Sequence, residues 1–274
     1  MRVRRPPPGS VGRALPAVTP LVLALVLLPG ASAWVRAQDE SPGSPSPRGD
    51  EGPVPLGTIL PVQLSSSLPL ARLQRGGAIE ARVAQEVPLG ARQRIPAGSK
   101  VLGHIVRLES PGGGVSRVGL TFDRVLLSKG RGMSLRAGLR AIASPASVEE
   151  AQIPGSGPDR GTPPSAWTTV QVGGDVVYRG GGPVVNGAGE SVGEPVAGGV
   201  LAELRPCGPC PNPREGKLTG ALWVFSVGAC GAYGYAHMAI VDAGCASGEG
   251  EILLSSVEGP LELRGGTGML LIAH

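Results

Sequence analysis

The chain has 274 residues, of which Gly (45) and Pro (28) are abundant, whereas Trp (3), Tyr (3) and Phe (2) are rare. That length suffices for one large domain or two modest ones, the scarcity of aromatic residues argues against a densely packed enzyme, and so much Gly and Pro without a G-X-Y period indicates segments that do not pack. The formal charge is +4, but residues 1–37 hold five arginines and no acid, so the remainder is close to neutral, and no nucleic-acid partner is expected.

The amino terminus has the pattern of a secretory signal. Four arginines precede an apolar run, residues 17–28, and small residues follow at once. That run is short of the ~20 residues that a membrane-spanning helix needs. We therefore expect a signal peptide over residues 1–37, cleaved after Ala33 or after Ala37, with an uncleaved anchor as the alternative. The mature protein would be exported to the periplasm, the outer membrane or the exterior, without an integral membrane span.

Composition divides the rest of the chain. Two parts of it contain regularly spaced apolar residues, and stretches rich in Pro, Gly and Ser precede and separate these two parts. The expected segments are a disordered leader (38–52), a β domain (53–142), a Gly/Pro-rich linker (143–199) and a second β segment (200–274) that is separate or completes the first domain.

Within residues 53–142 the apolar residues alternate with polar ones. Ile79, Ala81 and Val83 share one face of a predicted strand, and Glu80 and Arg82 share the other. The same alternation recurs at Val118, Leu120 and Phe122. A period of two is typical of half-buried strands.

A further alternation runs from Met133 to Ala141. It places Leu135 and Leu139 on the buried face and Arg136 and Arg140 on the solvated face.

The second segment contains four short apolar runs, at residues 222–225, 238–241, 251–254 and 269–272. Their length favours strands over helices, and Trp223 and Phe225 are expected in the core. The chain is therefore predicted to be all-β, with small barrel-like or sandwich-like domains of short strands and long disordered Gly/Pro-rich segments.

Residues 57–137 contain, in order, GTILPVQLSSSLPL, AIEARVAQEV, RIPAGSKVLGHIV and VGLTFDRVLLSKGRGMSLRA. This order resembles the carboxy-terminal β domain of TrbI-like conjugative-transfer proteins, the core components of type IV secretion systems. It also resembles uncharacterised secreted acidobacterial proteins that carry a similar unit. The resemblance implies a barrel-like β fold in the cell envelope.

Four cysteines are the most specific chemical signal: Cys207, Cys210, Cys230 and Cys245. Cys207 and Cys210 form a C-G-P-C motif like that of thioredoxin-like oxidoreductases, but the surrounding prolines disfavour the helix that would activate such a thiol. A zinc site would need a second paired knuckle, which the sequence lacks.

In an exported chain an even number of cysteines favours disulfides, of which three connectivities are possible. We expect Cys230 to pair with Cys207 or Cys210. No metal and no cofactor is expected.

Other candidate residues do not assemble a site. His104 falls on a strand face, and His237 and His274 are expected to be solvated. Ser191 lies in a G-E-S-V-G match to the nucleophile elbow, without the required strand and helix around it. The adjacent Glu149 and Glu150 read as a solvated acid pair.

We therefore expect no catalytic residue and no enzyme, but an exported envelope protein that acts as a structural or interaction module. Its partner would be an unknown envelope protein or a cell-wall component. The alternatives are a channel or core component of a conjugation-type secretion system, a periplasmic thiol-disulfide oxidoreductase using Cys207 and Cys210, and a hydrolase using Ser191.

Overall fold

The computed structural model describes residues 50–69, 73–112, 115–127, 130–155, 167–207, 219–243, 245, 250–258 and 261–274. The chain divides into two compact units, Met1–Ser44 and Pro45–His274, and every described residue belongs to the second. The expected signal peptide with its cleavage sites, Ala33 and Ala37, and most of the expected leader lie outside the described residues.

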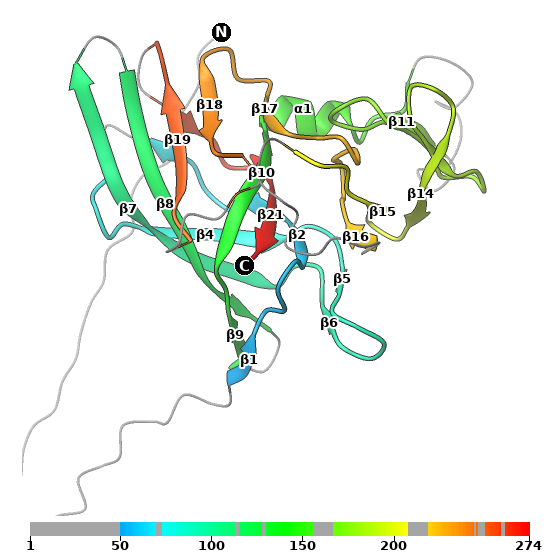
Figure 1. Cartoon of the computed structure of the whole chain (residues 1–274), viewed down its shortest axis with the longest axis horizontal. Coiled ribbons are helices and arrows are strands. Elements are labelled where there is room, and N and C mark those ends of the chain that lie inside the picture. The colour runs from blue at the N-terminus through cyan, green and yellow to red at the C-terminus, as the bar shows by residue number, and fades with distance from the viewer. Residues whose placement is uncertain are drawn as a thin grey trace, which may run out of the picture. The chain divides into compact units, whose positions relative to one another are not determined.

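The larger sheet joins strands from both ends of this unit. Its central order is β1-β9-β8-β7-β4-β2-β21-β10-β17, and β19 pairs with β8 and with β18. The long strands β7 and β8 form an antiparallel hairpin (Figure 1). The strands are β1 (Asp50–Pro53), β2 (Ile59–Leu64), β4 (Ala78–Val83), β7 (Lys100–Gly112), β8 (Val115–Leu126), β9 (Gly132–Ser134), β10 (Ala137–Ala143), β17 (Gly231–Tyr233), β18 (Met238–Val241), β19 (Ile252–Ser256) and β21 (Gly268–Ala273).

A second sheet is an antiparallel meander in chain order, from β11 to β16. Its strands are β11 (Thr168–Val170), β12 (Val176–Tyr178), β13 (Val184–Val185), β14 (Ser191–Val196), β15 (Gly199–Glu203) and β16 (Thr219–Ala221). Two short pairs complete the strands: β3 (Leu68–Pro69) with β20 (Glu262–Leu263), and β5 (Val87–Pro88) with β6 (Arg94–Ile95).

One short helix, α1 (Pro145–Glu150), follows β10. The Ser144 hydroxyl caps it by accepting from the Ser147 N–H, and Pro145 occupies its first turn, where a missing N–H costs nothing. Its buried residue is Val148.

Strands β10 and β21 lie between two hydrophobic cores. In β21, Met269 and Leu271 face the core of the larger sheet, whereas Leu270 and Ile272 face a second core that also holds Phe225. Every residue of both strands is buried. A central strand covered on both faces explains how a chain with few aromatic residues still builds a substantial interior.

The expectation that Arg140 faces solvent is wrong: its side chain is 3% exposed. The reason is a β-bulge in β10, where Leu139 pairs with Leu271 and Ala141 pairs with Leu270, so that Arg140 has no partner across the ladder. A bulge inserts one residue and re-aims the side chains around it. Arg140 is therefore turned into the interior, although the alternation that precedes it holds.

Two buried glutamines join the second sheet to the rest of the unit. The Gln85 side chain accepts from the N–H groups of Val200 and Trp223, at 3.1 and 2.6 Å, and donates to the Val200 carbonyl at 3.0 Å. Gln171 donates to the Phe225 carbonyl at 2.8 Å. A Cβ at Gly199 would collide with the Gln85 side chain and would lie 2.8 Å from the Trp223 Cα, so this junction requires a glycine.

The structure corrects two expectations about element boundaries. Residues 143–199, expected as a linker, contain α1 and most of the second sheet. Its strands are too short, two to six residues, to show a clear period between their glycine turns. Residues 222–225 form a buried turn rather than a strand, with Trp223 at a positive φ of 53°.

The all-β prediction is confirmed, and a sandwich-like class fits it. The predicted faces of β4 and β8 are confirmed too, since Ile79, Ala81, Val83, Leu120 and Phe122 are all buried. The second segment completes the larger sheet, because β21 pairs with both β2 and β10. Within the described part of the chain, no sheet closes on itself.

Two of the arginines that were expected in solvent are indeed exposed, Arg82 and Arg136. Replacing either with Gln is expected to change the free energy of unfolding by less than ~0.5 kcal/mol, because neither side chain loses buried contacts. Urea unfolding followed by circular dichroism measures this. A loss of several kcal/mol in either variant would mean that the side chain is buried.

Candidate functional site

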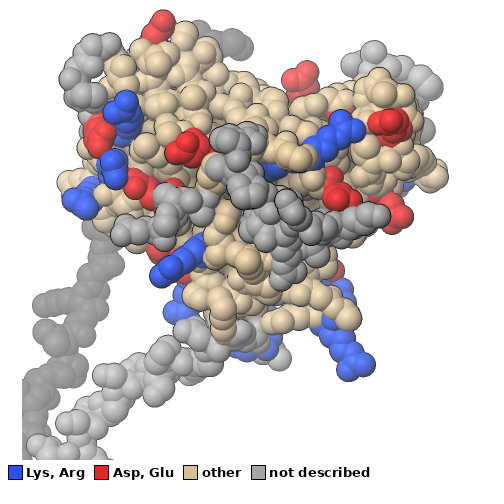
Figure 2. All heavy atoms as spheres, viewed as in Figure 1, with Lys and Arg blue, Asp and Glu red and all other residues tan. Residues whose placement is uncertain are grey.

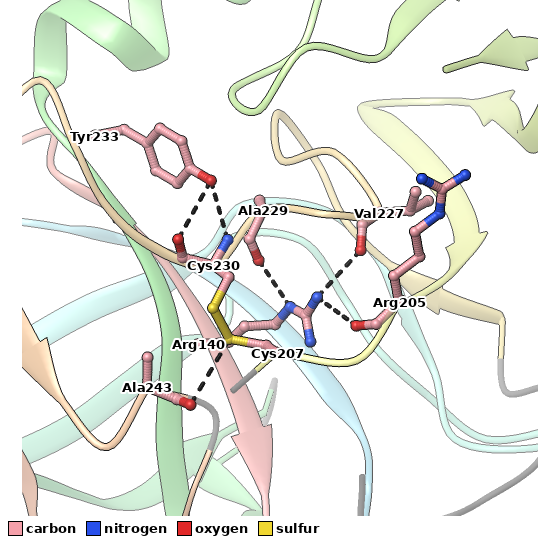
Figure 3. Close-up of a disulfide and its surroundings, with 8 residues drawn as sticks. All are labelled: Arg140, Arg205, Cys207, Val227, Ala229, Cys230, Tyr233 and Ala243. Carbon is pink, nitrogen blue, oxygen red and sulfur yellow. Dashed lines mark hydrogen bonds between the residues drawn. A yellow bond between two sulfur atoms is a disulfide. The ribbon is translucent and has the colours of Figure 1, made fainter. Parts of the chain in front are cut away.

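The Arg140 guanidinium is a buried charged group held by several hydrogen bonds (Figure 3). Its Nε donates to the Ala229 carbonyl at 2.8 Å, and its Nη2 donates to the carbonyls of Arg205 at 2.6 Å and Val227 at 3.1 Å. Burial lowers its pKa to about 10, so the side chain remains protonated at neutral pH. A buried cation is thus held by backbone oxygens of two chain segments.

A disulfide joins the same two segments. Cys207 and Cys230 are bonded, with their Cα atoms 5.8 Å apart, and they stand 23 positions apart in sequence. Of the two pairings left open for Cys230, the structure has the one with Cys207. The Cys207 Sγ also lies 3.7 Å from the carbonyl oxygen of Ala243 (Figure 3).

Further hydrogen bonds fix the second of these segments. The Tyr233 hydroxyl accepts from the Cys230 N–H at 3.0 Å and donates to its carbonyl at 3.4 Å. The Val227 N–H donates to the buried carboxylate of Asp175 at 2.8 Å. Burial raises the pKa of Asp175, while this hydrogen bond opposes the shift. Val227 therefore connects the two side chains, since its carbonyl accepts from Arg140 and its N–H donates to Asp175 in the turn before β12.

The bond between Cys207 and Cys230 uses the first of the two cysteines of the C-G-P-C motif. A thioredoxin-like active site cycles between a dithiol and a bond within the motif. Here Cys207 is bonded outside the motif, and Cys210 lies outside the described residues. Cys245 is disulfide-bonded as well, and no cysteine that the structure describes is a free thiol.

His104 lies in a groove of about 640 Å³ on the surface of β7 and β8, which is also lined by Glu251, the residue before β19. Its Nδ1 is 2.7 Å from the Asp123 carboxylate, and 43% of its side chain is exposed. Nearby, Arg107 makes a two-pronged contact with Glu251, at 2.9 and 3.2 Å. The groove therefore presents two contacts between a basic side chain and a carboxylate, His104 with Asp123 and Arg107 with Glu251.

Basic and acidic side chains are interspersed over the face of the molecule seen in Figure 2. On β7 and β8, Glu109 contacts both Arg107 and Arg117. Such alternation is typical of a solvated sheet face and differs from the single-sign patch that binds a phosphate backbone.

The other histidines lie apart from this groove. His237 contacts Glu258, its Nε2 lying 3.3 Å from the carboxylate, with 47% of its side chain exposed. His274, expected in solvent, is half-buried: its Nε2 is buried without a partner among the described residues, and burial lowers its pKa.

Ser191 is the exposed first residue of β14 and is followed by strand, so the elbow geometry of a hydrolase is absent there. Glu149 and Glu150 are exposed at the end of α1 rather than in a loop. Neighbouring positions on a helix point in different directions, which does not suit a pair of catalytic carboxylates.

Across the ranges that the structure describes, no group of three or more His, Cys, Asp or Glu side chains could hold a metal ion. Nor does any helix there have the length and apolar character needed to cross a membrane.

Sequence reasoning missed Arg140 as the centre of the site. The signal that could have found it is the composition of β10, where small and apolar residues occupy both faces around one charge. A strand without a polar face is typical of one that is covered on both sides.

Comparison with protein families found no match, and comparison with curated proteins found none either. Among solved structures the chain is similar to ComB10 of the Com type IV secretion system of Helicobacter pylori. The sequences are 22% identical, the TM-score is 0.25, and the match covers 30% of this chain and 41% of that chain. The match thus spans less than half of the ComB10 chain.

Proposed function

We propose that this chain is an exported, non-enzymatic protein of the cell envelope that acts as a structural or interaction module. Its partner would be another envelope protein or a cell-wall component. The signal segment, residues 1–33 or 1–37, would direct export and be removed, leaving a β unit without an integral membrane span.

The observation that carries the proposal is the state of the cysteines. The bond between Cys207 and Cys230 ties the segment after β15 to the segment before β17, and the buried Arg140 holds both. Structural disulfides persist in oxidising compartments and are rare in a reducing cytosol. A bond set into a buried hydrogen-bond network supports a structural role for these cysteines.

Two alternatives have weaker support. An oxidoreductase would need Cys207 and Cys210 as its redox pair, whereas Cys207 is bonded to Cys230. The resemblance of residues 57–137 to TrbI-like proteins favours a conjugation component. Secreted proteins that lack a conjugation machinery carry a similar unit, however.

The experiment that tests the proposal is the intact mass of the protein recovered from fractionated cells that express the natural gene. We expect a mature chain that begins at Trp34 or Gln38, in the periplasmic, outer-membrane or extracellular fraction. A chain that retains residues 1–33 and stays with the inner membrane would show that the apolar segment is an anchor. Recovery from the cytosol would contradict export.

A further inference from the structure

We propose that Arg140 selects Cys207, rather than Cys210, as the disulfide partner of Cys230. Both cysteines are candidate partners of Cys230, because Cys207 and Cys210 stand only three positions apart in the C-G-P-C motif. Four cysteines allow three disulfide connectivities, and in two of these connectivities Cys230 is bonded to a cysteine other than Cys207.

The contacts of Arg140 lie in the two segments that must meet. Arg205, whose carbonyl accepts from Nη2, stands two positions before Cys207, and Ala229, whose carbonyl accepts from Nε, immediately precedes Cys230. The Arg205 N–H also donates to the Val227 carbonyl at 2.9 Å, so the segments are in register next to the guanidinium. This register brings the two Cα atoms to the 5.8 Å that a disulfide requires.

The backbone of Arg140 is positioned independently of the segment that carries Cys207. It belongs to β10, which pairs with β21 from Ala137 to Ala143, whereas its other neighbour, β17, begins directly after Cys230. The bulge in β10 aims the side chain at the segments, and the guanidinium presents several donors in a rigid plane. One side chain can therefore bind three carbonyls of two segments before any sulfur has reacted.

The chemistry itself needs no further group from this chain. Two thiols become one disulfide by losing two protons and two electrons, which pass to a disulfide oxidant through thiol-disulfide exchange. Arg140 acts as a positioning residue: it determines which thiolate attacks the mixed disulfide at Cys230, and it takes no part in the electron transfer, in which the oxidant is reduced to two thiols. The inference goes beyond the proposed function and does not depend on the partner.

The test is oxidative refolding of the full mature chain from the reduced, denatured state in a glutathione redox buffer, followed by proteolysis and mass spectrometry of the linked peptides. The wild type is expected to give the bond between Cys207 and Cys230 as the main product. In Arg140→Met that fraction should fall several-fold, with Cys210 taking the place of Cys207 in part of the molecules. Arg140→Lys should restore part of the fraction, and Arg136→Met, an exposed position beside β10, should match the wild type.

A second pair of chains separates selection from a failure to fold. In a background where Cys210 and Cys245 are serine, no competitor for Cys230 remains. There Arg140→Met should form the bond between Cys207 and Cys230 and recover the circular dichroism spectrum of the same background with Arg140. If that chain stays unfolded, or if Arg140→Met in the four-cysteine chain keeps the wild-type connectivity, the selection role is overturned.

Discussion

Replacing Arg140 with Met is expected to lower the free energy of unfolding by about 3 kcal/mol. The change removes three hydrogen bonds and leaves the buried Ala229 carbonyl and the partly buried Arg205 carbonyl without this donor, whereas the Val227 carbonyl keeps the Arg205 N–H. A buried polar group without its partner costs about 1–3 kcal/mol, and removal of a buried cation recovers part of that total by ending its desolvation. Urea unfolding of the oxidised protein, followed by circular dichroism, measures the difference.

Arg136→Met is the matched control, since Arg136 lies beside the same strand and is exposed. It is expected to unfold within ~0.5 kcal/mol of the wild type. Equal stabilities for the Arg140 and Arg136 variants would mean that the guanidinium is not held by the carbonyls.

Removing the bond between Cys207 and Cys230 is expected to cost about 3 kcal/mol. Its two cysteines are 23 positions apart, and a crosslink of that span restricts the unfolded chain by an amount close to this value in the chain-entropy description. The double replacement Cys207→Ala with Cys230→Ala is the suitable variant, because a single one would leave a thiol free to attack the remaining disulfide. Thermal unfolding of both proteins, without reductant, gives the comparison.

The second comparison in that experiment uses the wild type treated with reductant. Reductant should lower its melting temperature at least as far as the double replacement does, because Cys245 is disulfide-bonded too. A melting temperature that neither treatment changes would contradict a stabilising role for the bond.

The sequence was informative where strands are long and have one polar face. The alternation of Ile79, Ala81 and Val83 gave the correct faces, because β4 is covered on one side only. Turn chemistry was reliable as well, since Gly98 in the I-P-A-G turn has a positive φ of 81°. The fold class followed from these regular elements.

The misplaced Arg140 and the undecided partner of Cys230 share one physical origin, which is that burial on the second face of β10 depends on segments far away in sequence. From its local sequence Arg140 is predicted to face solvent, because that sequence does not show that the chain around Val227 packs over β10. The pairing of Cys230 could be narrowed to two partners but not decided, because it depends on the same packing. Strands as short as Val184–Val185 show no period at all, so a sheet made of such strands reads as a linker.

The central claim, that the cysteines are structural and oxidised, is tested most directly by alkylation of the native protein isolated from cells without reductant. Iodoacetamide is applied at neutral pH, first to the folded protein and then after denaturation, and the intact mass counts the labelled thiols. The account predicts almost no label in either step, because Cys207 and Cys230 are bonded to each other, Cys245 is disulfide-bonded, and no cysteine in the described part of the chain is a free thiol. Rapid labelling of Cys207 in the folded protein, together with reduction or oxidation of a dithiol substrate that is lost in Cys207→Ser, would contradict it and establish the oxidoreductase instead.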